Sequence, residues 1–270
     1  MYFETHIVDH CNLNCAGCAH FSPLVKEKRF KDLNEFKIEL QRLLDVFGDD
    51  VVEFNLLGGE PLLHPQVEEF ISSARSILGN DVLIDLTTNG LLMKSKGEEF
   101  YNLLNSLKIR VKFTDYGLDI DKSFVDKIEN ILVTNQQKMF NISLNLNGTQ
   151  NSNVMYYLCP ANWKDWHGNV FGGCFMLRDG HLYNCAVAAY ANDFEREFNF
   201  KFDGSLEKMA INIFTHNKEE IIEFLTHPHE FCKYCNIYRL ERSHAPMHKS
   251  EHKIEEWIDV NETLPNFLKK

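Results

Sequence analysis

Short apolar segments alternate with longer amphipathic ones through the first 150 residues, and this alternation constrains the fold more than any other feature. Strands are predicted at residues 2–9, 51–57, 82–86, 109–114 and 140–146. Helices are predicted where apolar residues recur at helical spacing, at 34–47, 66–78, 98–107 and 122–132. Strands that alternate with helices form a parallel sheet covered by helices, so the sequence predicts an α/β fold.

The composition narrows the class of protein. The chain has 270 residues and a formal net charge of -11 at pH 7, so as a whole it repels phosphate backbones and anionic lipid surfaces. We expect no nucleic-acid partner and no membrane partner. The apolar runs are only a few residues long, and the first six residues lack the basic and apolar regions of a secretory signal. A cytoplasmic location is therefore expected.

The pattern of the sequence changes after the polar segment 147–153, which indicates a domain boundary. Residues 175–183 predict a β-hairpin around Asp179-Gly180, and residues 211–225 predict a helix. The charged tail contains an amphipathic piece near Trp257. The predicted units are a core domain over 1–153, a small hairpin-plus-helix domain over 154–248 and a tail over 249–270.

Three of the eight cysteines form a group near the N-terminus. Cys11, Cys15 and Cys18 have the spacing C-x3-C-x2-C. Three thiolates on one short loop can bind three irons of a 4Fe–4S cluster and leave the fourth iron open for a ligand. The same spacing suits a structural zinc site, with His10 or His20 as the fourth ligand.

Two further unusual segments follow predicted strands. Gly58-Gly59-Glu60-Pro61 follows the second strand and Thr87-Thr88-Asn89-Gly90 follows the third, as the cysteine loop follows the first. In a barrel of parallel strands the carboxyl ends share one face, so these three segments are predicted to meet there. Glycines let the backbone approach a ligand closely, and Glu60 offers a carboxylate to a ligand amine. This convergence favours a reactive cluster over a structural site.

With these motifs the chain resembles the radical S-adenosylmethionine (SAM) superfamily over about residues 1–150. The resemblance implies a partial (β/α)6 TIM-like barrel and a 4Fe–4S cluster on Cys11, Cys15 and Cys18, whose open iron chelates SAM. It also implies reductive cleavage of SAM to methionine and a 5'-deoxyadenosyl radical, which takes a hydrogen atom from the substrate.

The resemblance assigns further residues to SAM. The Gly-Gly-Glu segment of the family contacts the methionine amine, and here it is Gly58, Gly59 and Glu60. Contacts with the ribose are implied for Asn89 and for Asn145 or Asn147.

The later cysteines predict a second metal site. Cys174 and Cys185 lie at the two ends of the predicted hairpin, and Cys232 and Cys235 form a C-x2-C knuckle. Four such thiolates suit either zinc or a second 4Fe–4S cluster. Similarity to the twitch extension, a shortened SPASM domain, implies the cluster. Cys159 is a rival of Cys174 as the first ligand, and otherwise it is a buried thiol or a hydrogen-atom donor to a substrate radical.

The resemblance favours a radical SAM oxidoreductase that acts on a small molecule and oxidises a secondary alcohol of a carbohydrate or aminocyclitol. Epimerisation of a sugar or peptide, with Cys159 as hydrogen donor, is the second prediction, and peptide modification is the third. Asp115, Tyr116 and Arg178 are further candidates for groups that contact the substrate. A flavodoxin or ferredoxin is expected as electron donor. A zinc-stabilised binding protein without chemistry is the alternative from another class.

Overall fold

The computed structural model describes residues 1–135, 143–159, 163–164, 170–172, 175–204, 206–236 and 248–258. The strands in this part of the chain are β1 (Tyr2–Val8), β2 (Glu53–Gly58), β3 (Leu83–Thr88), β4 (Arg110–Asp115), β5 (Ile131–Asn135), β6 (Trp163–Lys164), β7 (Val170–Gly172), β8 (Phe175–Arg178), β9 (His181–Tyr183) and β10 (Ala210–Asn212). The α-helices are α1 (Leu33–Phe47), α2 (Val67–Leu78), α3 (Met93–Ser106), α4 (Ser152–Leu158), α5 (Ala186–Phe198), α6 (Leu206–Met209) and α7 (Lys218–Leu225).

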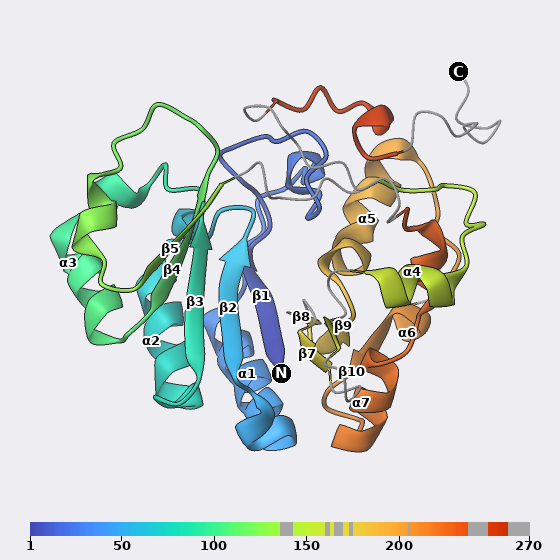
Figure 1. Cartoon of the computed structure of the whole chain (residues 1–270), viewed down its shortest axis with the longest axis horizontal. Helices are drawn as coiled ribbons and strands as arrows, with labels where there is room; N and C mark the ends of the chain where they lie inside the picture. The colour runs from blue at the N-terminus through green and yellow to red at the C-terminus, as the bar shows by residue number, and fades with distance from the viewer. Residues whose placement is uncertain are drawn as a thin grey trace.

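The main sheet has the strand order β10-β9-β8-β1-β2-β3-β4-β5. The strands from β8 to β5 are parallel, whereas β9 and β10 extend the β8 edge in antiparallel pairing. The outermost strands, β10 and β5, do not pair with each other, so the sheet is an open barrel. Figure 1 shows α1, α2 and α3 beside the β1–β4 part of the sheet and α5 beside β8 and β9. The predicted α/β partial barrel is confirmed.

Two apolar cores hold the molecule together. In the first, α1 buries Phe36, Leu40 and Leu43 at helical spacing against the sheet, as the sequence predicted. The second core surrounds α5 and collects aromatic side chains from distant segments, such as Phe21 and Trp257. The loop after β1 and the end of the described chain therefore pack on the same helix (Figure 1).

The predicted hairpin is confirmed and belongs to the main sheet. β8 and β9 are joined by Asp179 and Gly180, whose φ angles of 51° and 72° are those of a tight primed turn. β8 pairs with β1 in parallel, from Phe3 opposite Phe175 to Glu4 opposite Met176. The hairpin thus continues the sheet of the core.

One predicted helix near residue 130 is wrong, and the strand predicted after it is tested only in part. The helix expected at 122–132 is a short 3-10 turn, Ser123–Lys127, followed by β5. The β-branched run in β5 pairs with β4, and this pairing overrides the weak helical pattern. Of the strand expected at 140–146, residues 140–142 lie outside the described part, and Leu144 in the remainder forms isolated bridges to Cys235 and Ile258.

The helix expected at 211–225 is also wrong in its first half. Residues 210–212 form β10 against β9, and α7 starts only at Lys218, where its N-cap Asn217 forms a capping box with Glu220. The sequence analysis missed α5, which begins at the N-cap residue Cys185 and is rich in alanine.

Candidate functional site

A cavity of about 150 Å³ lies at the carboxyl ends of β1, β2, β3 and β4. All three predicted segments line it, since the cysteine loop, the Gly-Gly-Glu turn and Thr87–Asn89 meet there. Thr114 and Tyr116, at the end of β4, complete this wall. The structure therefore brings together residues that the sequence placed on separate strand ends.

The Gly-Gly-Glu turn holds the start of the cysteine loop. The Gly59 N–H donates to the Val8 carbonyl at 2.8 Å, and the Glu60 N–H donates to the His10 carbonyl at 3.1 Å. A Cβ atom on Gly59 would lie 2.2 Å from the His10 carbonyl oxygen, and one on Gly58 would lie 2.2 Å from that of Val8. Glycine is therefore required at both positions because β1 and the chain after it lie so close to them, in addition to any contact with a ligand.

Glu60 is completely buried and accepts hydrogen bonds from three donors. Its Oε1 accepts from the Leu62 N–H at 3.0 Å and the Thr88 hydroxyl at 2.8 Å, and its Oε2 accepts from the Asn89 N–H at 2.8 Å. Burial raises the pKa of Glu60 to about 7, although these donors oppose the shift. The carboxylate is thus fixed in position and carries a charge that burial destabilises, which suits an ammonium group or other cation.

The thiols of Cys11, Cys15 and Cys18 all line the cavity. Burial raises the pKa of Cys11 to about 12 and that of Cys15 further, and the neighbouring thiols add to both shifts. Thiolates here need nearby positive charge, which the irons of a cluster supply. The donor set therefore fits a cluster. His20, a candidate zinc ligand, uses its Nδ1 atom to contact His6, and no three His, Cys, Asp or Glu side chains in the described residues are grouped to hold one metal ion.

The last described segment braces the cysteine loop. The Ala16 N–H donates to the His248 carbonyl at 2.8 Å, and the Ser250 N–H donates to the Asn14 carbonyl at 2.7 Å. The buried indole of Trp257 donates to the Cys18 carbonyl at 3.0 Å. The sequence analysis gave this segment no role in the site.

The two predicted ribose contacts have partners within the chain. The Asn89 amide donates to the Asn12 side chain at 2.7 Å and approaches the Cys11 sulfur at 3.7 Å. The Asn145 amide donates to the Thr149 hydroxyl at 3.0 Å, and its oxygen accepts from the Asn147 N–H at 2.9 Å. Asn89 lines the cavity, whereas Asn145 is absent from its lining.

The candidate substrate residues lie in different surroundings. Tyr116 lines the cavity, and burial together with the nearby thiols raises its pKa well above the usual value. Asp115 forms an ion pair with Lys122 at 2.6 Å, and this contact lowers its pKa. Arg178 is absent from the lining of this cavity. It contacts Asp9 instead, with a nitrogen–oxygen distance of 3.7 Å.

A second group of thiols forms between α4, α5 and the 3-10 helix Glu230–Tyr234. The Tyr156 hydroxyl and the Asn184 amide both donate to the Leu225 carbonyl, at 3.0 and 3.1 Å. These bonds tie the segments just before Cys159 and Cys185 to the segment that leads to Cys232. Burial raises the pKa of Cys185 well above its usual value, and the nearby thiols of the other three cysteines, Cys159, Cys232 and Cys235, add to this shift.

This group bears on the choice between Cys159 and Cys174. Cys159 lies near enough to Cys185 and the Cys232–Cys235 knuckle for their charges to interact, although these thiols are not grouped to hold a single metal ion in the described residues. Cys174 lies outside the described residues. In the described part of the chain, no helix is long and apolar enough to span a membrane.

Solved structures with related folds include BtrN in complex with AdoMet and 2-DOIA, at 17% identity and a TM-score of 0.48, covering 90% of this chain and 87% of that one. Native anSMEcpe with bound AdoMet is 14% identical, with a TM-score of 0.49 and 95% of each chain covered.

Two curated relatives are GTP 3',8-cyclases. The protein from Microcystis aeruginosa is 34% identical over 101 residues, which are 37% of this chain and 30% of that protein. The protein from Campylobacter jejuni subsp. doylei is 21% identical over 247 residues, covering 88% of this chain and 77% of that protein. The chain thus spans less than a third of the first relative.

A family model described as the radical SAM superfamily matches residues 5–151, the region that carries β1 to β5 and the cysteine loop. The match covers more than half of the 270 residues. The chain therefore belongs to the radical SAM superfamily, whose members use SAM and a 4Fe–4S cluster.

Proposed function

We propose that this protein is a radical SAM dehydrogenase that oxidises a secondary alcohol of a small polar carbohydrate or aminocyclitol. The observation that carries the proposal is the pair of thiol groups: three thiols at the cavity of the barrel and four thiols beside α5. The first group suits the SAM-binding cluster of the family. The second group supports the choice of oxidation.

At the first site, Cys11, Cys15 and Cys18 would hold three irons and leave one open for SAM. When bound and reduced, the cluster with SAM supplies a 5'-deoxyadenosyl radical that abstracts hydrogen. The protein itself fixes the position of the ligands. Glu60, held by three donors, offers its carboxylate to the methionine amine, and Gly59 fixes the loop that bears the thiols.

The second site favours oxidation over epimerisation. Conversion of a secondary alcohol to a ketone removes one hydrogen atom, one proton and one further electron, so it needs an electron acceptor. Epimerisation instead needs a hydrogen-atom donor such as a free thiol. Cys159 was the candidate donor, but it lies with three other cysteines, where a ligand role for a second cluster accounts for it.

Cyclisation of GTP is the second candidate, because the curated relatives carry out that reaction by name. A triphosphate needs several cationic side chains, usually arginine or lysine. Among the described residues that line the cavity, none is Lys or Arg, and the chain is acidic overall. This lining supports a substrate without phosphate groups over GTP.

Deuterium transfer tests the proposal. The reconstituted enzyme is reduced under anaerobic conditions with SAM and each member of a panel of perdeuterated sugars and aminocyclitols, with GTP as the competing candidate. For a sugar or aminocyclitol we expect deuterium in 5'-deoxyadenosine and a ketone product that has lost one carbon-bound deuterium and one hydroxyl hydrogen. A product one mass unit lighter, with solvent hydrogen in place of one carbon-bound deuterium, would show epimerisation, and deuterium transfer only from labelled GTP would favour cyclisation. Two zinc ions and no SAM cleavage would support the zinc-stabilised binding protein.

A further inference from the structure

Three polar side chains form a connected series beneath the cavity. His6 lies in β1, and its Nδ1 is 3.1 Å from Oδ1 of Asp9. The other ring nitrogen, Nε2, is 2.6 Å from Nδ1 of His20. His20 lines the cavity with the cysteines, whereas His6 and Asp9 line a separate cavity of about 120 Å³. The series Asp9–His6–His20 thus connects the two cavities.

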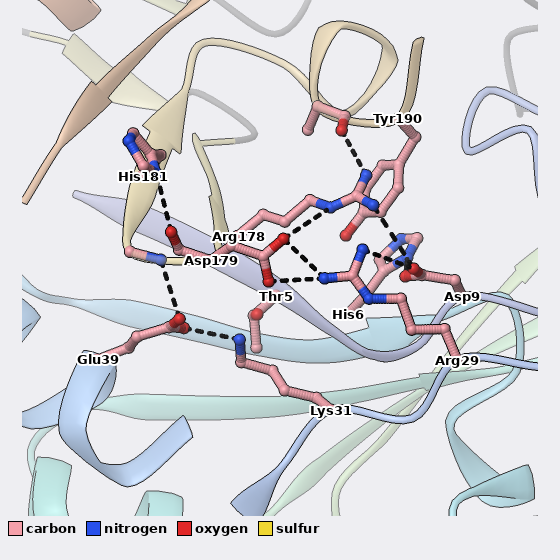
Figure 2. Close-up of polar contacts among 12 residues, drawn as sticks. Thr5, His6, Asp9, Arg29, Lys31, Glu39, Arg178, Asp179, His181 and Tyr190 are labelled. Atoms are coloured by element: carbon pink, nitrogen blue, oxygen red, sulfur yellow. Dashed lines mark hydrogen bonds and ion pairs between the residues drawn. The ribbon is translucent and has the colours of Figure 1, made fainter. Parts of the chain in front are cut away.

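The Asp9 end of this series is held as a carboxylate. Figure 2 shows Asp9 between His6 and the guanidinium groups of Arg29 and Arg178, whose nitrogens lie 3.8 and 3.7 Å from Asp9 Oδ2. The two guanidinium charges beside Asp9 favour its carboxylate form. A carboxylate only accepts hydrogen bonds, so Nδ1 of His6 is the donor in this contact.

The donor at Nδ1 sets the direction of the remaining bonds. The His6 ring is stacked on Tyr190 at 3.9 Å, and burial lowers the pKa of His6, so the ring is neutral. A neutral ring with a proton on Nδ1 has an acceptor at Nε2. Nδ1 of His20 must therefore donate to it, which leaves Nε2 of His20 as an acceptor.

This acceptor and the Ser22 hydroxyl, which also has no hydrogen-bond partner in the described residues, differ from two other polar groups of the cavity. Glu60 and Asn89 are engaged by hydrogen bonds within the protein. In the described part of the chain, no group donates to Nε2 of His20. We propose that His20 is a binding residue whose Nε2 accepts a hydrogen bond from an alcohol hydroxyl in the cavity, and that His6 and Asp9 are its positioning residues. The inference rests on the proposed function, in which both SAM, through its ribose, and the substrate bring such hydroxyls.

Calorimetric titration of the reconstituted holoenzyme tests the inference and separates the two sources of the hydroxyl. SAM is titrated first, and scyllo-inosamine is then titrated onto the SAM-loaded enzyme. His20→Phe removes the acceptor, whereas His20→Gln retains one. We expect His20→Phe to weaken at least one of the two ligands by about tenfold, the value of one hydrogen bond, and His20→Gln to recover most of it.

A loss confined to SAM assigns the ribose, and a loss confined to scyllo-inosamine assigns the substrate. His6→Phe keeps a ring against Tyr190 but removes the acceptor for His20. We therefore expect a loss of ligand affinity that is smaller than in His20→Phe, and His6→Gln should restore the affinity. His64→Gln, a buried histidine outside this cavity, is the matched control.

The inference is overturned if His20→Phe binds both SAM and scyllo-inosamine with the affinities of wild type. It is equally overturned if the two proteins bind SAM with equal affinity and neither of them binds scyllo-inosamine. It is also overturned if His20→Gln is impaired as much as His20→Phe. A wild-type holoenzyme that neither binds nor cleaves SAM would instead contradict the proposed function.

Discussion

At the scale of single residues, the site depends on the absence of a side chain at Gly59. Because the backbone of His10 occupies the space of a Cβ atom there, Gly59→Ala must displace the cysteine loop. We expect a loss of stability of ~1–3 kcal/mol and a loss of iron from the first cluster. Gly79→Ala is the control: this residue has a φ of 75° but nothing within 4 Å, so strain should lower stability without loss of iron. Equal iron content in both variants would contradict the assigned role of Gly59.

Asp9 predicts a dependence of stability on pH. Its pKa is lowered in the folded protein, so its stabilising effect is complete above the ordinary value of 3.8 and is lost as the pH falls through the lowered value. At pH 7 we expect Asp9→Asn to lower the free energy of unfolding by about 1–3 kcal/mol. The difference from wild type, measured by urea unfolding, should shrink below pH 4. A difference that is constant with pH would show that the carboxylate charge has no part in it.

At the scale of elements, the spacing of apolar residues predicted the helices and strands whose formation depends on local sequence. β1 to β4, α1 and α2 appeared close to their observed bounds because each buries one continuous apolar set. β5 was missed because its neighbours Val111 and Phe113 in β4, distant in sequence, decide its pairing. α5 was not predicted, although its alanines favour a helix and Cys185 is its N-cap residue, because Cys185 was interpreted only as a metal ligand.

The start of α1 offers a test at this scale. The Asp32 carboxylate accepts hydrogen bonds from the Asn34 and Glu35 N–H groups, at 2.8 and 3.0 Å. Asp32→Ala leaves both donors without this partner and should lower stability by about 1 kcal/mol, measured by thermal unfolding. Asp32→Asn retains an acceptor oxygen and should lie close to wild type. Equal losses in the two variants would show that the cap does not account for the effect.

At the scale of the whole molecule, the sequence predicted that the three segments of the first cavity meet, but it predicted the grouping of the later cysteines only in part. Strand order alone places Cys11, Glu60 and Asn89 at one edge, so local sequence sufficed. The hydrogen bond from Trp257 to the Cys18 carbonyl joins residues 239 positions apart, and no local sequence pattern predicts it. The same holds for Cys159, whose partners are brought together by bonds to the Leu225 carbonyl.

Cys159 therefore provides a test of the second site. We expect Cys159→Ala to reduce the iron content from about eight to about four per chain, because a Cys₄ site loses one of its ligands. Cleavage of SAM in the absence of substrate should persist, since the first cluster is intact, whereas turnover of substrate should be lost. Full iron content in Cys159→Ala would exclude the residue as a ligand and would return the assignment to Cys174.

Formation of 5'-deoxyadenosine by the reconstituted, dithionite-reduced protein tests the central claim most directly. If the thiols at the barrel cavity hold a cluster with one open iron, wild type cleaves SAM to 5'-deoxyadenosine and methionine. Cys15→Ala, which lacks one of the three cavity thiols, should form neither. Intact SAM after incubation with the cluster-loaded wild type, or equal cleavage by Cys15→Ala, would contradict the account.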